Sequence, residues 1–205
     1  MNEKNNTAAV AENAATKDEQ AWFRPKFALY KPNGKGTGCA LKLELHPAHG
    51  SVEGSIWAMF ASQLTIGDRR APNPTYPRFD WDNVICVKLG FQDLTRILQV
   101  FRGECEAIED GKGLFHRSPR GTTKIGLRHH VEPNPGYSFE VHRSVGLQAE
   151  DSHAHIFIAP NEALGLCSAI ENALGVICFG IPVVVERDTS VYRRSVREMD
   201  HAKAS

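Results

Sequence analysis

The chain has 205 residues, 41% of them hydrophobic and 23% charged, which is typical of a globular protein with its own core and excludes a collagen, a coiled coil or a disordered chain. Its 24 Lys and Arg residues are balanced by 24 Asp and Glu residues, which excludes a histone-like protein that binds polyanions through bulk charge. No apolar run reaches the roughly 20 residues that span a bilayer, so we expect no membrane segment.

The two ends of the chain lack a core-forming pattern. We therefore expect a tail at 1–24, a single domain at 25–182 and a charged tail at 183–205. The first residues have neither an apolar segment nor a cleavage-site pattern, so we expect no secretory signal. The five cysteines are an odd, scattered set among apolar residues, which predicts buried free thiols in a reducing compartment. A cytoplasmic or nucleoid location is the expectation.

Period-two alternation of apolar and polar residues predicts half-buried antiparallel strands along most of the domain. In chain order we expect strands at 26–31, 39–46, 55–63, 84–89, 113–117, 122–131, 137–142 and 154–158. Turn signals at 32–34 and 134–136 separate some of them. In 122–131 the alternation predicts two faces, an apolar one with Ile125, Leu127 and Val131 and a polar one with Lys124, Arg128 and His130.

Two segments change to the helical period. The first stripe consists of Leu94, Ile97, Leu98, Phe101, Cys105 and Ile108, and the second of Ala163, Leu166, Cys167, Ile170, Leu174 and Ile177. A constant offset of 69 residues relates them, and it also aligns Val87 with Ile156 and Asp93 with Glu162. The chain is therefore predicted to be a duplicated α+β unit, several strands and then a helix, twice. Such apolar helices can cover a sheet or pack against other protomers.

Charge is unevenly distributed along the chain. Residues 112–143 hold six basic side chains against two acidic ones, whereas the remainder holds 18 against 22. The same window contains four of the nine histidines, His116, His129, His130 and His142. Because an unperturbed histidine has a pKa of about 6.5, affinity for a polyanion is expected to rise as the pH falls.

Four short motifs occur in a characteristic order. They are Lys35-Gly36-Thr37-Gly38-Cys39-Ala40-Leu41, Phe79-Asp80-Trp81, Glu104-Cys105-Glu106 and Val131-Glu132-Pro133. With the duplicated plan they resemble the Whirly family of single-stranded-DNA-binding proteins, which is related in fold to the kinetoplastid guide-RNA-binding proteins. Over about 26–180, the resemblance implies two antiparallel four-stranded sheets, a homotetramer held by the helices, and nucleic acid running over the sheets with little sequence preference. The family's turn has two lysines flanking a glycine before Ala-Ala-Leu, and here only Lys35 is a substitute.

Binding of a single strand needs cations that follow its backbone and aromatic faces on which bases stack. The candidate residues are Lys35, Lys42, Trp57, Arg117, Lys124, Arg128 and His130. The alternative is that the cations form a solvated strand face and that Trp57 belongs to the core. We expect the chain to bind single-stranded nucleic acid, DNA rather than RNA. An RNA-binding protein and a protein-interaction or transcription-cofactor module on the same scaffold remain alternatives.

Three other motifs suggest different chemistry. Residues 34–38 have the composition of a phosphate loop, but a strand is predicted after them, which favours a flexible turn or a backbone–phosphate contact. His153-Ala154-His155 and His129-His130 raise a zinc hypothesis, although no Cys-x-x-Cys or His-Glu-x-x-His motif accompanies them. Phe79-Asp80-Trp81 is expected to be a structural corner, with Trp81 buried and Asp80 bonded to local amides. Without a catalytic signature, we expect no enzyme, no metal and no cofactor.

Overall fold

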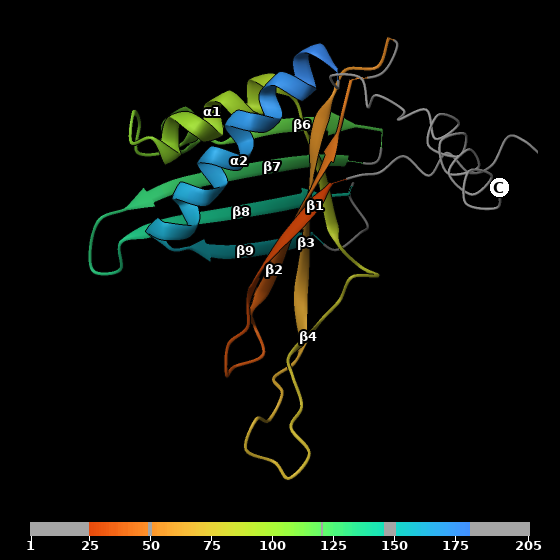
Figure 1. Cartoon of the computed structure of the whole chain (residues 1–205), viewed down its shortest axis with the longest axis vertical. Helices are drawn as coiled ribbons and strands as arrows, with labels where there is room; N and C mark the ends of the chain where they lie inside the picture. Colours follow the sequence, from red (N-terminus) through yellow and green to blue (C-terminus); the bar gives the residue numbers. More distant parts are fainter. Residues whose placement is uncertain (1–24, 49–50, 120, 146–150, 181–205) are drawn as a thin grey trace, which may run out of the picture.

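The computed structural model describes residues 25–48, 51–119, 121–145 and 151–180. Both expected tails, 1–24 and 183–205, lie outside the described residues. Two antiparallel sheets and two long helices make up the described part of the chain (Figure 1). This arrangement confirms the α+β prediction.

The first sheet forms from consecutive strands of the N-terminal half. Its strands are β1 (Lys26–Lys31), β2 (Cys39–His46), β3 (Ser55–Thr65), β4 (Arg78–Phe79) and β5 (Ile85–Leu89). β2 lies between β1 and β3, and β5 pairs with the first part of β3. β4 pairs with the end of β3, where the register shifts between Gln63 and Thr65. The sequence did not predict β4, because two residues are too few to show alternation.

The second sheet contains four antiparallel strands in chain order. They are β6 (Leu114–Ser118), β7 (Gly121–His130), β8 (Gly136–Ser144) and β9 (Ser152–Ile158). In Figure 1 these strands run across the direction of β1, β2 and β3. The prediction that Val131 faces the core is wrong: this side chain is 70% exposed. Pairing of β7 with β8 ends at His130 opposite Gly136, so Val131 already belongs to the turn.

The two helices begin in the same way. α1 (Phe91–Phe101) and α2 (Pro160–Phe179) each have an acidic residue in the first turn that accepts a hydrogen bond from the backbone N–H before the helix. Asp93 Oδ2 accepts from Gly90 at 3.0 Å, and Glu162 Oε2 accepts from Ala159 at 2.8 Å. Each carboxylate therefore satisfies an amide and faces the positive end of the helix dipole.

α1 is shorter than its predicted stripe, because the chain leaves the helix after Phe101. Gly103 adopts a φ of 73°, and the Glu104 N–H donates to the Gln99 carbonyl at 2.9 Å. This is the left-handed glycine ending that satisfies the last carbonyls of a helix. Cys105 therefore lies outside α1, and Ile108 is buried in the short 3-10 helix η1 (Ile108–Gly111).

The predicted duplication is present in space. β1, β2, β3, β5 and α1 form one unit, and β6, β7, β8, β9 and α2 form the other, with the same strand order. Arg102 and Glu171 occupy equivalent positions of the two repeats, because they are 69 residues apart. They are in contact, and the Arg102 guanidinium donates to Glu171 Oε1 at 2.8 Å. A single core joins the two units, with Phe60 of β3 packed edge-on against Phe139 of β8 at 5.2 Å.

Both helices pack on the apolar side of the second sheet, α1 against β7 and α2 against β8 (Figure 1). α2 is also long and apolar enough to cross a membrane by length and composition alone, with a mean hydropathy of 1.4. In the described structure 28% of its most apolar 18-residue window is buried, and its buried side chains, among them Leu166 and Ile170, belong to the core that joins the sheets. Among the described residues, no helix covers the opposite faces of the two sheets. These faces are called below the first and second open face.

The cysteines match the prediction only in part. All five are free, but only Cys39 is buried, three are half-buried and Cys178 is exposed. Burial raises the pKa of Cys39 to about 11, so this thiol is protonated at neutral pH. Apolar neighbours in sequence therefore did not predict burial for the cysteines on the helices.

Candidate nucleic-acid interface

The second open face collects the polar positions of β6, β7, β8 and β9. Successive side chains of a strand point to opposite sides, so every second residue shares this face. Its members, read from the strand registers, are Phe115, Arg117, Thr122, Lys124, Arg128, His130, Ser138, Glu140, His142, His153, His155 and Phe157. The intervening residues, such as Ile125 and Leu127, are buried in the core.

A cation and an exposed ring lie together at the β6 side of this face. Phe115 is 59% exposed, and Lys124 Nζ lies 5.8 Å from the centre of its ring. Phe115 and Lys124 are register partners on neighbouring strands, and Arg117 is exposed two residues along β6. The pair offers a flat apolar surface for a base next to a positive charge for its phosphate.

Arg128 and His130 share this face but already have partners. Arg128 Nη1 lies 3.2 Å from Glu106 Oε1, in the segment between α1 and η1. His130 Nε2 lies 2.8 Å from the Ser138 hydroxyl on β8. The prediction placed both on the correct face, but the charge of Arg128 is partly balanced by Glu106.

The first open face presents aromatic rings. Trp57 of β3 is 36% exposed and stacks on His46 of β2 at 5.3 Å, so the alternative that it is a core residue is wrong. Lys42 Nζ lies 4.7 Å from the ring of Trp81, which in turn meets Tyr30 edge-on at 6.2 Å. Tyr30 is 55% exposed, and this face therefore repeats the combination of cation and ring.

The Phe79-Asp80-Trp81 motif is a corner, as predicted, but Trp81 is half-buried rather than buried. Asp80 Oδ1 accepts from the backbone N–H groups of Asp82 and Asn83 at 3.3 and 3.1 Å. The hydrogen bond from the Asn83 side chain is the main reason that the pKa of Asp80 is lowered. The corner holds the Trp81 ring over β2.

The glycine-rich turn between β1 and β2 carries Lys35 on its surface. Its backbone amides are used internally: those of Lys35 and Thr37 donate to Asn33 Oδ1, and that of Gly38 to Gln63 Oε1, each at 3.0 Å. β2 follows the turn, so neither a phosphate loop nor a contact through these amides fits. Of the turn, only the Lys35 side chain remains as a candidate phosphate contact.

A hollow connects this turn to the second sheet. It measures about 290 Å³ and is lined by residues 36–39 of the turn, by Ser62 and Gln63 of β3, and by residues 153–155 of β9. Lys35 therefore lies beside a hollow that reaches His153 and His155. This brings the turn of the first sheet next to the histidines of the second.

Known proteins share this architecture but little sequence. No family model and no curated protein matches the chain. The Arabidopsis thaliana protein WHY1 superposes with a TM-score of 0.60 over 87% of this chain and 94% of its own, at 16% identity. WHY3 of the same plant superposes with a TM-score of 0.60 over 85% of this chain and 95% of its own, at 18% identity. The chain has the Whirly fold. The plant transcriptional regulator PBF-2 superposes with a TM-score of 0.57 over 86% of this chain and 88% of its own, at 17% identity.

Within this Whirly fold, the histidines of the basic window divide between the two sides of the second sheet. His116 Nε2 lies 3.2 Å from Asp93 at the start of α1, and His129 stacks on Tyr137 at 4.8 Å. Both lie on the helix side, so only His130 and His142 reach the open face. Of the four histidines in the basic window, His130 and His142 are therefore the two that could face a polyanion from this side.

β9 contributes two further histidines to the second open face, for which the sequence left open a metal site, a solvated position and contact with nucleic acid. His153 stacks on His142 with ring centres 4.0 Å apart, and His155 is the register partner of Glu140. Burial, and then the neighbouring His142, lowers the pKa of His153. Strand alternation in residues 153–155 was the signal that could have placed them on this face.

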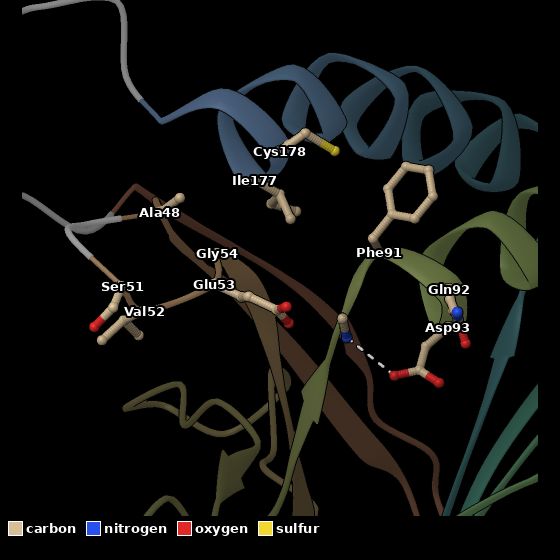
Figure 2. A pocket seen from close by; sticks show the side chains of 11 residues that line it. Ala48, Ser51, Val52, Glu53, Gly54, Phe91, Gln92, Asp93, Ile177 and Cys178 are labelled. Carbon is tan, nitrogen blue, oxygen red and sulfur yellow. Dashed lines mark hydrogen bonds between the residues drawn. The ribbon is translucent and has the colours of Figure 1, made fainter.

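A hollow of about 690 Å³ lies on the helix side of the Whirly fold (Figure 2). It opens between residues 51–54, the start of α1 and the end of α2. Its charged lining residues are Glu53 and Asp93, and Asp93 already accepts from the Gly90 amide. Without a basic group among the lining residues, this hollow does not suit a phosphate backbone.

Proposed function

We propose that this chain binds single-stranded nucleic acid, DNA in preference to RNA, with little sequence specificity. The observation that supports the proposal most is the repeated pairing of a lysine with an accessible ring, Lys124 with Phe115 and Lys42 with Trp81. Stacking of a base on an aromatic side chain contributes about 1–3 kcal/mol. Every base has such a face, so this mode of binding tolerates sequence variation.

The overall charge of zero also supports this mode. A protein without excess positive charge must gain its affinity from local cations and from ring surface, and only unpaired bases offer their faces. The Whirly resemblance of the sequence implies the same ligand. We propose binding rather than catalysis, in a cytoplasmic, nucleoid-associated protein.

We further propose that the chain assembles as a homotetramer through its helices. The outward side of α2 carries Leu164, which is 74% exposed, and Phe179, which is 90% exposed. A Cβ added at Gly165 or Gly175 would meet nothing within 4 Å, so this side has room for the close approach of another helix. Exposed apolar surface of this kind is typical of subunit interfaces.

A binding assay with matched oligonucleotides tests the proposed function. Fluorescence anisotropy at low salt should show affinity for oligo(dT), weaker affinity for oligo(U), and the weakest for a duplex of the same length. Equal or tighter binding of oligo(U) would favour an RNA-binding protein. Absence of binding to all three would contradict the proposal and favour a protein-interaction module.

Two matched pairs of variants locate the site. Trp57→Ala should weaken binding by about 1–3 kcal/mol, because a stacking surface is lost, with little change in salt dependence. Phe91→Ala is the control, since Phe91 is 50% exposed but lines the hollow on the helix side. Lys124→Ala should weaken binding and Arg102→Ala should not, because Arg102 pairs with Glu171 of α2 on the helix side.

A further inference from the structure

β8 and β9 bring metal-binding side chains together at one place on the second open face. In the strand register His142 lies directly opposite His153, and Glu140 lies directly opposite His155. All four side chains share one side of the sheet, because they occupy alternate positions. Adjacent paired strands hold such a set more rigidly than a loop does.

The distances suit a single ion. One ligand atom from each of Glu140, His142 and His153 lies within 4.8 Å of the other two. Around a tetrahedral zinc ion with bonds of about 2.0–2.1 Å, ligand atoms are about 3.4 Å apart. His142 and His153 are both exposed, so small rotations of their side chains can close this difference without moving the strands.

We propose that Glu140, His142 and His153 bind one divalent transition-metal ion, with Zn²⁺ as the best fit and a fourth position open to water or to His155. Two imidazoles and one carboxylate are a zinc ligand set, whereas Mg²⁺ prefers six oxygen ligands. The carboxylate balances one of the two charges of the ion. This inference goes beyond the proposed function and does not depend on it.

Two neighbouring residues leave space for the ion. Gly126 of β7 lies opposite Glu140, and a Cβ there would come within 2.8 Å of Glu140 Oε1, so the glycine makes room for the carboxylate. Lys124 lies opposite His142, but its ammonium group is directed to the Phe115 ring on the β6 side. The cation therefore points away from β9.

Titration of the chelator-treated full-length protein with Zn²⁺ alone, in the absence of nucleic acid, tests the proposal. Isothermal titration calorimetry should show one ion per chain, and Co²⁺ should give the visible absorption of a four-coordinate site. Loss of a residue that only supports a metal ligand typically weakens metal binding about 10–100-fold. His142→Gln and His153→Gln remove a ligand itself, so each should weaken Zn²⁺ binding by at least that factor. Both residues are exposed, so the variants are expected to fold, which circular dichroism checks.

His130→Gln is the matched control, because His130 lies on the same face but contacts Ser138 instead. It should leave metal affinity unchanged. Unchanged affinity in the double variant His142→Gln, His153→Gln, or no binding to the wild-type chain, would overturn the proposal. Oligonucleotide binding is measured separately on the metal-free protein. The metal proposal and the proposed function can therefore each fail without the other.

Discussion

Gln63 shows how one buried polar side chain holds the turn between β1 and β2. Its side-chain oxygen accepts from the amides of Asn33 and Gly38, and its side-chain nitrogen donates to the carbonyls of Asn33 and Thr65. Only 7% of Gln63 is exposed, so these groups have little access to water. The turn that carries Lys35 therefore keeps its shape through a residue that is 25 positions away from Gly38.

Replacing this amide should destabilise the protein. We expect Gln63→Leu to lower the free energy of unfolding by about 2–3 kcal/mol, because two backbone amides lose their acceptor. Urea denaturation measures the change. Gln99→Ala, at an exposed position of α1, is the control and should change stability little. Equal stability of both variants would mean that the turn does not depend on Gln63.

The contact between His116 and Asp93 should make stability depend on pH. The hydrogen bond to Asp93 raises the pKa of His116 above its usual 6.5, although burial opposes it. Burial acts to raise the pKa of Asp93, but the hydrogen bonds from His116 and Gly90 outweigh it and lower that pKa. His116 and Asp93 also line a second hollow, of about 350 Å³, together with Arg96, Glu109 and Lys112. Arg96 pairs with Glu109 there at 3.0 Å.

The sign follows from linkage. A histidine whose pKa is higher in the folded than in the unfolded protein stabilises the fold. This stabilisation is complete below the pKa of the unfolded state and is lost as the pH rises through the pKa of the folded state. The free energy of unfolding should therefore fall as the pH rises above about 6.5, the ordinary histidine pKa, and through the raised pKa of His116, and His116→Gln should flatten this fall. His130→Gln should leave it in place. A slope that His116→Gln does not change would assign the effect to another group.

At the scale of an element, β7 shows that one polar strand face contains different environments. Lys124 lies over an exposed ring, Arg128 pairs with Glu106, and His130 contacts a serine hydroxyl. A cation that already has a carboxylate partner must give up that contact to bind a phosphate. The three residues are therefore expected to contribute unequally to binding of a polyanion.

Salt dependence distinguishes them. Lys124→Ala should lower the log–log slope of affinity against salt concentration by about 0.7, the value for one phosphate contact on a single strand. Arg128→Ala should lower it less, because Glu106 already neutralises part of the charge. Binding measured at several salt concentrations checks both. An equal decrease for the two variants would show that the ion pair opens on binding at little cost.

At the scale of the whole molecule, the two repeats share one core but differ in how much of their helix is covered. The buried side of α2 faces β8 and α1, and its outward side carries exposed apolar and small residues. The proposed contact with other chains would account for apolar residues on both sides of α2.

Light scattering tests this assembly. The wild-type protein should have about four times the chain mass of 22.7 kDa at micromolar concentration. Leu164→Glu should dissociate the assembly, because it places a carboxylate in an apolar interface, and should leave the protomer folded, since Leu164 is 74% exposed. Asn161→Glu, near the start of the same helix, is the control. A wild-type mass of one chain would contradict the prediction.

Local periodicity was sufficient to predict most of the elements. The strand at 26–31 agrees with β1, alternation from Cys39 to His46 agrees with β2, and the offset of 69 residues agrees with the spatial repeat. These features depend on which side of each strand or helix is apolar, and a single segment contains that information. The end of α1 was missed because apolar spacing continues past Phe101, whereas Gly103 ends the helix.

Partners across the fold were decided by tertiary structure alone. The sequence placed Lys124, Arg128 and His130 on one face, but which of them meets a carboxylate depends on a loop 22 residues away. Trp57 lies between apolar neighbours on both sides, so alternation could not assign its face. His142 and His153 became neighbours only through the register of β8 with β9. Alternation determines the side on which a residue lies, and the packing of distant segments determines what it contacts there.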